Sequence, residues 1–335
     1  MKNWKSAVGI VLSVALLAWT LKGVSLVAVW SELERSNLLL FVASAVAATL
    51  IFPLRAIRWR IILQPVAPDL PLAPLWRSIA IGGMVNNLVP ARAGEIARAY
   101  ALTRETPVSF ASALASLAVD RLFDMVVLLG LGVAAMFDPA FPSGARVAGQ
   151  TVGHLAQGTI ALMVVLVAGL YMLAIFPSQL VRAFEIFARK VSPTVEERGK
   201  SALLRFSAGL SVLKSPGRFA SVFAWTIAHW LMNALAFWLG FMAVGIKLGF
   251  AAALFLQLLI AIGVALPSAP GFFGVFEKLA TVGLAIYGIS ATAATSWAIG
   301  FHILSFIPIT VIGIYYFSRL GLSFRELRAQ SESPA

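Results

Sequence analysis

Long apolar runs separated by short polar segments dominate the chain. A membrane-spanning helix needs about 20 consecutive apolar residues. Six runs approach or exceed that length, at about residues 6–29, 37–54, 109–136, 155–176, 219–244 and 291–317. The first run follows Lys2 and Lys5, as in a signal peptide, but no small-residue cleavage site closes it, so we interpret it as an uncleaved span. The pattern predicts an all-α integral membrane protein with about six full transmembrane helices.

Two further apolar regions, at about residues 75–101 and 250–287, are interrupted near their middles by proline and glycine. The interrupting residues are Pro90, Gly94, Pro267, Pro270 and Gly271. Such backbone is tolerated at membrane depth only where it is buried in protein or lines a cavity. We therefore expect each region to form a re-entrant helical pair rather than a crossing.

The basic residues give the orientation. With the amino terminus in the cytoplasm, only Arg35, Arg146 and Lys247 of the loop residues fall outside, and the other basic loop residues fall inside. Cytoplasmic loops of membrane proteins carry this excess of Lys and Arg. The distribution predicts a multi-pass protein of the cytoplasmic (inner) membrane with both termini cytoplasmic. It also explains the net charge of +12 without nucleic acid as a partner.

Composition narrows the functional classes. The chain of 335 residues is 60% hydrophobic and 12% charged, whereas soluble domains average about 45–50% and about 25%. It contains no cysteine, and its three histidines are far apart, so we expect neither a thiol nucleophile nor a metal site nor a cofactor. We expect one transmembrane domain over residues 1–335, with a cytoplasmic amphipathic segment at about 178–218.

The two interrupted regions predict an internal repeat. Each contains the pattern Pro-x-x-x-Gly followed by an acid, at Glu95 and Glu277. Each half of the chain, about 6–136 and about 155–317, would then hold three crossings and one re-entrant pair. Because three is odd, the second half enters the membrane upside down. Inverted repeats with broken helices that meet near the midplane are a recurring transporter architecture.

Charged and amide side chains inside the apolar regions are candidates for function. We expect a lipid headgroup to bind Asn86, Asn87, Arg92, Arg98 and Arg121. We expect Glu95, Asp120, Asp124, Glu277 and His302 to couple transport to protons or cations, or to pair with the bases. The alternative for all of these charges is a purely structural role in holding the broken helices.

Spacing suggests particular partners. Asp120 and Asp124 lie four apart on one helix face and would repel each other without bases, for which we expect Arg92 and Arg98. Glu95, three residues before Arg98, can also pair with it. The neighbouring basic residues Arg55, Arg58 and Arg60, with Trp59, fit an interfacial anchoring belt better than a site, and His229 and His302 fit packing better than a direct role.

Three motifs in order give the chain a family resemblance. Residues 88–95 read LVPARAGE, residues 120–124 read DRLFD, and residues 266–277 read LPSAPGFFGVFE. Together they resemble the lysylphosphatidylglycerol synthase transmembrane, or flippase-like, family over about residues 10–320. That family includes multiple peptide resistance factors, proteins linked to dolichol-type glycan lipids and a hopanoid-associated branch.

The resemblance implies lipid translocation rather than chemistry, with an anionic phospholipid, a hopanoid or a lipid-linked glycan precursor as cargo. The aminoacyl-transferase domain of larger members is not in this sequence, so we do not expect lysylation of phosphatidylglycerol. Two alternatives stay open: a membrane enzyme that acts on a lipid carrier, with Asp120 and Asp124 binding a divalent ion, and an assembly factor of an envelope-lipid pathway. Faces of small residues allow a homodimer without requiring one.

Overall fold

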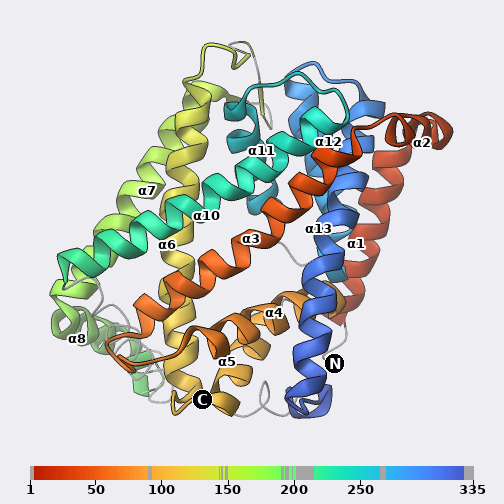
Figure 1. Cartoon of the computed structure of the whole chain (residues 1–335). Helices are drawn as coiled ribbons and strands as arrows, with labels where there is room; N and C mark the ends of the chain where they lie inside the picture. The colour runs from red at the N-terminus through yellow and green to blue at the C-terminus, as the bar shows by residue number, and fades with distance from the viewer. Residues whose placement is uncertain are drawn as a thin grey trace.

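The structure is a computed structural model, and it describes residues 4–89, 93–142, 144, 146–147, 150–189, 192, 196–197, 199–200, 215–264 and 269–327. Helices make up nearly all of the described secondary structure (Figure 1). They are α1 (Trp4–Leu21), α2 (Leu26–Glu34), α3 (Leu38–Leu63), α4 (Leu72–Leu88), α5 (Gly94–Glu105), α6 (Phe110–Met136), α7 (Val152–Ile175), α8 (Pro177–Ala188), α10 (Pro216–Ala243), α11 (Phe250–Val264), the 3-10 turn η2 (Pro270–Phe272), α12 (Val275–Ile286) and α13 (Ala291–Arg319). Two short antiparallel strands, β1 (Arg146–Val147) and β2 (Gln150–Thr151), precede α7.

Three of the described helices, α3, α10 and α13, are long and apolar enough to cross a membrane, and α1 with α2 would make a fourth crossing. α1 and α2 are bent by 80° relative to each other, so the straight first span expected at 6–29 is interrupted. The chain leaves the helix at Gly23 with a φ of +79°. Ser25 then starts α2, because its side chain accepts a hydrogen bond from the N–H of Ala28. The six-crossing count stays a prediction.

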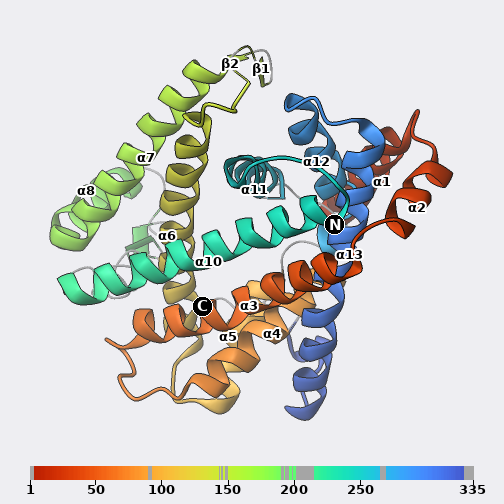
Figure 2. The ribbon, with the colours of Figure 1, turned by 45° about the horizontal axis from the view of Figure 1, so that its top comes forward.

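The central helices are α3 and α10, which lie side by side in both views (Figures 1 and 2). Their contact is close where Ser44 donates a hydrogen bond of 2.6 Å to the carbonyl oxygen of Ala236. α3 continues nine residues beyond the run expected to end at 54, as far as Leu63. This extension carries Arg58 into the protein interior, where it becomes part of the site described below.

Each interrupted region forms two short helices packed against each other. α4 packs on α5, and α11 packs on α12. The α4–α5 pair lies at the lower end of Figure 1 and the α11–α12 pair at the upper end. The turn η2, between α11 and α12, contacts α4. Parts of the two interruptions themselves, residues 90–92 and 265–268, lie outside the described residues, and they include the expected site residue Arg92 and the expected breaks Pro90 and Pro267.

Glycine permits the close approach of α4 and α5. A Cβ atom on Gly82 would lie 2.8 Å from the carbonyl oxygen of Gly94, and one on Gly94 would overlap Gly82 and the side chain of Asn86. The N–H of Gly94 donates a hydrogen bond of 2.9 Å to Oδ1 of Asn86. Gly94 is therefore both the first residue of α5 and a packing residue against α4.

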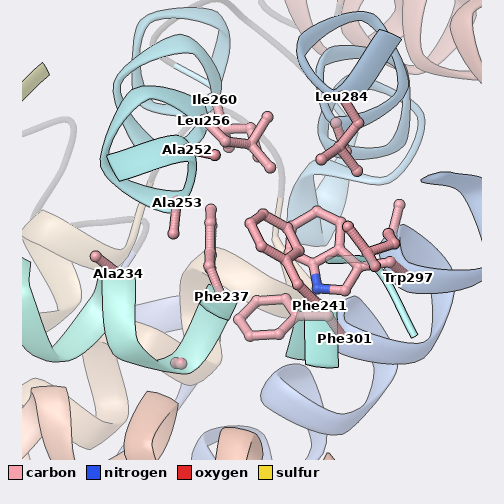
Figure 3. Close-up of a cluster of buried hydrophobic side chains, with 14 of the residues drawn as sticks. Ala234, Phe237, Phe241, Ala252, Ala253, Leu256, Ile260, Leu284, Trp297 and Phe301 are labelled. Atoms are coloured by element: carbon pink, nitrogen blue, oxygen red, sulfur yellow. The ribbon is translucent and has the colours of Figure 1, made fainter. Parts of the chain in front are cut away.

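An aromatic cluster joins α10, α12 and α13 (Figure 3). The ring of Phe237 meets that of Trp297 edge-on at 5.2 Å and that of Phe301 at 4.9 Å. Trp297 is completely buried. Alanines 252 and 253 of α11 and Leu284 of α12 close the cluster. This packing fixes the positions of α12 and α13, which carry the second group of polar site residues.

The segment expected to be amphipathic, at about 178–218, is described only in part. α8 covers its beginning, and residues 201–214 lie outside the described residues. Arg189 donates hydrogen bonds to Glu196, and Lys200 pairs with Glu185 at 2.6 Å. The hydrogen bond from Arg189 lowers the pKa of the Glu196 carboxyl. The expected role of the segment at the membrane surface stays a prediction.

Candidate functional site

Arg58 of α3 lies at the centre of a buried ion-pair network. Its side chain is 0% exposed. Its guanidinium lies 2.6 Å from Oδ1 of Asp120 and 2.6 Å from Oδ1 of Asp124, both on α6, and it donates a hydrogen bond of 3.2 Å to Thr226 of α10. The two carboxylates that share a helix face are thus neutralised by a base from another helix.

This position corrects the sequence interpretation of Arg58 and Trp59 as interfacial anchors. Trp59 is also completely buried, and its indole N–H donates a hydrogen bond of 2.8 Å to Ser116. The interpretation was wrong because α3 does not end where its apolar run ends. One further signal was present in the sequence: Arg55 and Arg58 lie three apart, which on a continuing helix places both on one face.

Arg98 of α5 reaches the same network from below. It donates a hydrogen bond of 3.2 Å to Oδ2 of Asp120, which confirms Arg98 as a partner of that acid. Its guanidinium carbon lies 3.9 Å from the ring centroid of Trp59, a cation–π arrangement. The Nε and Nη2 atoms of Arg98 have no hydrogen-bond partner among the described residues. Buried donors normally have partners, so these two nitrogens are available to an acceptor that enters the cavity described below.

Glu95 pairs with Arg121 of α6 and not with Arg98, so the pairing of Glu95 and Arg98 suggested by their spacing is wrong. Arg121 also lies 3.5 Å from Oδ2 of Asp124. The Arg121 side chain is 44% exposed and that of Glu95 is 29% exposed, whereas Asp120 is fully buried. The Glu95–Arg121 pair therefore forms the accessible edge of the network.

α10 contributes residues that the sequence analysis did not place in the site. Trp230 donates a hydrogen bond of 3.1 Å from its indole N–H to Oδ1 of Asp124. His229, assigned to packing in the sequence analysis, is buried with Nδ1 3.7 Å from the same oxygen. Asn233 donates a hydrogen bond of 3.0 Å to Gln257 of α11. The amides at 233 and 257 interrupt otherwise apolar helices, which is the signal that would have identified them.

Two cavities adjoin the network. The first, which we call the arginine cavity, has a volume of about 190 Å³. Its polar lining comes from α3, α4, α5 and α6 and consists of Arg55, Asn86, Asn87, Glu95, Arg98 and Arg121. All described members of the expected headgroup-binding set therefore line one space. Asn87 also donates a hydrogen bond of 2.8 Å to Thr310 of α13, which holds its amide at the cavity wall.

The second, which we call the tip cavity, has a volume of about 300 Å³ and lies beside η2. Its polar lining consists of Arg55, Asn87, His229, Trp230, Asn233, Gln257, His302 and Ser305. Phe52, Arg55, Asn87, Phe272 and Ile309 line both cavities. The two spaces are therefore neighbours, and Phe272 of the second interruption forms part of the wall between them.

The second interruption is held by its own polar cluster. Glu277 of α12 accepts a hydrogen bond of 2.6 Å from the N–H of Gly274, and its other oxygen lies 2.6 Å from Nδ1 of His302. Nε2 of His302 lies 2.8 Å from the carbonyl oxygen of Gly271. Glu277 was expected as a coupling or pairing residue and His302 as either such a residue or a packing histidine, and the structure brings the two together.

The expected residues therefore fall into two groups. Arg98, Arg121, Glu95, Asp120 and Asp124 belong to the network on α3, α5, α6 and α10, and Glu277 and His302 belong to the second interruption. Within the described part of the chain, no three His, Asp or Glu side chains are grouped so that they could hold a metal ion.

A family comparison identifies the protein's relatives. Residues 6–313 match the family described as the lysylphosphatidylglycerol synthase TM region. The chain belongs to this family. The match covers the interruptions and both groups of polar residues, and it confirms the resemblance carried by the three sequence motifs. Together with the apolar helices α3, α10 and α13, it shows a membrane protein of the lysylphosphatidylglycerol synthase TM-region family.

Curated relatives fit this assignment. The chain is 27% identical over 330 residues to "Glycosyltransferase AglD" of Haloferax volcanii, which covers 91% of this chain and 52% of that protein. It is 23% identical over 342 residues to a "UPF0104 membrane protein" of Methanothermobacter thermautotrophicus, which covers 96% of this chain and 97% of that protein. The chain thus spans about half the length of the Haloferax protein and nearly all of the Methanothermobacter one.

Proposed function

We propose that this protein moves a polar-headed lipid between the leaflets of the cytoplasmic membrane. The observation that carries the proposal is the pair of adjoining cavities, one lined by arginines and amides and the other lying beside the second interruption. A headgroup that crosses a bilayer needs polar partners along its path, because each buried charge without partners costs several kcal/mol. The two adjoining cavities supply such partners one after the other along the path.

The charge of the network favours an anionic headgroup. Among the described residues, the arginines at 55, 58, 98 and 121 face the acids at 95, 120 and 124, so four positive charges meet three negative charges. Arg98 and Arg55 keep guanidinium nitrogens without hydrogen-bond partners in the described structure. Arginine binds phosphate oxygens through two parallel hydrogen bonds. A phosphate group in the arginine cavity would supply both the missing charge and the missing acceptors.

The inverted-repeat topology is part of this proposal. Six crossings and two re-entrant pairs would place α4–α5 and α11–α12 in opposite leaflets, as their positions at opposite ends of Figure 1 suggest. The contact between η2 and α4 would then join the two interrupted regions within the membrane. α1 begins in the lower half of Figure 1 and α13 ends at its lower end, which fits two termini on the cytoplasmic side.

A membrane enzyme is the second candidate, because the Haloferax relative is called a glycosyltransferase. In that reading, Asp120 and Asp124 would bind a divalent ion. The guanidinium of Arg58 already lies within 2.6 Å of both carboxylates, so an ion there would have to displace a fully buried base. This geometry supports transport over divalent-dependent transfer for this domain.

Leaflet exchange in liposomes tests the proposal. The full chain is reconstituted with headgroup-labelled anionic, zwitterionic or polyprenyl-phosphate lipids, and the exchange rate is compared with that of Arg55→Gln. Arg60→Gln is the matched control, since Arg60 lies on the same helix and lines neither cavity. We expect exchange of one anionic lipid class to fall about tenfold or more in Arg55→Gln, which equals about 1.4 kcal/mol, and to persist in Arg60→Gln.

Absence of exchange of every lipid class by the folded wild-type protein, with and without a proton gradient, would overturn the proposal. Turnover of a lipid-linked substrate that depends on a divalent ion would support the enzyme instead.

A further inference from the structure

His302 is enclosed by hydrogen-bond partners and aromatic rings. Its Nδ1 lies 2.6 Å from Glu277, and its Nε2 lies 2.8 Å from the carbonyl oxygen of Gly271. The ring stacks on Phe273 with centroids 4.4 Å apart, and the ring of Phe276 lies at 4.5 Å on a tilt. The His302 side chain is 9% exposed and that of Glu277 is 2% exposed. The imidazole is therefore fixed in one orientation.

This geometry determines how many protons the pair holds. A carbonyl oxygen can only accept, so Nε2 of His302 carries a hydrogen. Nδ1 and the Glu277 oxygen, at 2.6 Å, then need a second proton between them, because two lone pairs at that distance would repel each other. The pair is neutral with both protons, whether it is written as imidazolium and carboxylate or as imidazole and carboxylic acid. Loss of one proton to water in the tip cavity leaves it with one negative charge.

The deprotonated pair cannot keep all of its hydrogen bonds. If the remaining proton stays on Nδ1 and is donated to Glu277, the lone pair of Nε2 faces the carbonyl oxygen of Gly271. That contact becomes repulsive, and Gly271 is released. If the proton stays on Nε2, the lone pair of Nδ1 faces a carboxylate, which is worse because that group is charged. Deprotonation therefore favours detachment of the turn η2, which contains Gly271, from His302.

The backbone at Gly271 is poised to move. Gly271 has a φ of +66° and Phe272 a φ of +62°. The left-handed region is costly for a side chain such as phenylalanine, so other contacts must hold it there. His302 provides one of these contacts, and Ser13 of α1 provides another by accepting a hydrogen bond of 2.8 Å from the N–H of Ala269. Phe272 lines both cavities, so its displacement would alter the wall between them.

Few other charges face the pair. Arg55 of α3 and His229 of α10 line the same cavity as His302. Lys278, next to Glu277, points to α1, where its ammonium nitrogen lies 3.8 Å from the ring centroid of Trp19. Glu32 of α2, the helix packed on α13, and Arg35, which directly follows α2, line a separate pocket with the end of α10. α11 has no ionisable residue. Arg55 is the fixed positive charge that shares the tip cavity with His302.

We infer that Glu277, His302 and the carbonyl group of Gly271 form a proton-binding site. When the site holds its proton, it keeps the turn η2 of the second interruption closed between the arginine cavity and the tip cavity. Coupling of this site to lipid movement rests on the proposed function, but the proton-dependent closure itself does not. The buried acids Asp120 and Asp124 do not take this role, because Arg58 lies against both.

Thiol labelling tests the closure without any lipid transport. The chain contains no cysteine, so Ser305→Cys places a single thiol in the wall of the tip cavity. The rate of reaction with a small water-soluble methanethiosulfonate is measured in liposomes from about pH 5.5 to about pH 8.5. The same thiol in a His302→Gln background corrects for thiolate formation, since glutamine can donate to Gly271 but does not titrate.

We expect the rise in labelling rate with pH to be roughly threefold larger or more with His302 than with His302→Gln. Glu277→Gln, checked for folding by gel filtration, is expected to lose the additional rise as well, whereas Lys278→Gln is expected to keep it. Equal pH dependence in the His302 and His302→Gln backgrounds would overturn the proton site, as would loss of the additional rise in Lys278→Gln.

A second arm tests coupling. Proton flux is followed with a trapped pH dye while lipid exchange is measured under a pH gradient. Gradient-dependent exchange that becomes independent of the gradient in His302→Gln supports coupling, and gradient-dependent exchange that persists in folded His302→Gln contradicts it. A proton-dependent labelling switch in a protein that exchanges no lipid would refute the proposed function and leave the proton site standing.

Discussion

Arg58 and Asp124 lie 66 positions apart in the chain, yet a guanidinium nitrogen of one lies 2.6 Å from a carboxylate oxygen of the other. Arg58 binds Asp120 at the same distance, so one buried base joins α3 to two turns of α6. Thr226 and Trp230 attach α10 to the same network. Three helices therefore meet at one group of charges. This gives Arg58 a structural importance that its neighbours in the sequence, two arginines and a tryptophan typical of a membrane interface, did not indicate.

Replacement of Arg58 should destabilise the protein strongly. Arg58→Met keeps much of the side-chain volume but leaves Asp120 and Asp124 buried without their shared base. Removal of one partner from a buried ion pair typically costs about 3–5 kcal/mol. We expect a clear fall in the apparent melting temperature in detergent, followed by tryptophan fluorescence. Arg60→Met is the control on the same helix, and an Arg58→Met protein that melts with it and with the wild type would show that the network is dispensable.

The contact between Gly82 and Gly94 makes a second prediction about packing. A methyl group on Gly82 would lie 2.8 Å from the carbonyl oxygen of Gly94 and 2.9 Å from Cβ of Arg98. These are backbone or near-backbone atoms, which cannot turn away. We expect Gly82→Ala to push α5 from α4 and to cost about 1–3 kcal/mol, the usual range for overpacking.

Gly130→Ala is the matched control, because its new methyl group would meet only the Met163 sulfur at 3.7 Å. Both variants are compared by thermal unfolding and by gel filtration. If Gly82→Ala were as stable as Gly130→Ala, the close approach of α4 and α5 at this point would be wrong.

The sequence predicted the helical membrane class and the two interruptions well, because apolar length and proline with glycine act locally. Pro270 and Gly271 do form a turn between two short helices, and Gly94 does begin one. The bend between α1 and α2 was missed, although Gly23 and Ser25 are ordinary signals for a helix end and a helix start. They lay inside a run whose hydrophobicity was treated as uniform.

The partners of the site residues were harder to predict than the residues themselves. Glu95 could reach Arg98 along one helix, but tertiary packing places Arg121 of α6 beside it. Asp124 found its base on α3 and its indole donor on α10, and no spacing within α6 could indicate either. Periodicity identifies the face on which a charge lies, whereas its partner depends on which helix packs there.

The Glu95–Arg121 pair allows structural support to be separated from ligand binding. Arg121→Glu places two acids together and Glu95→Arg places two bases together, so each single variant should lose stability and lipid exchange. The double variant restores the pair with its charges exchanged. If the two side chains only hold α5 to α6, the double variant should bring both the melting temperature and the exchange rate back toward the wild-type values, short of the contribution of the Arg121–Asp124 contact of 3.5 Å that the exchange removes.

If Arg121 binds the headgroup from its place in the arginine cavity, as we propose, the exchanged pair should recover stability alone. The melting temperature would then return toward the wild-type value, while exchange of the anionic lipid stays about tenfold or more below it, a difference of about 1.4 kcal/mol. The two readouts are measured on the same liposome preparation. Full recovery of exchange in the double variant would show that the headgroup site does not need its arginine at position 121, since Glu95→Arg places one in the same cavity.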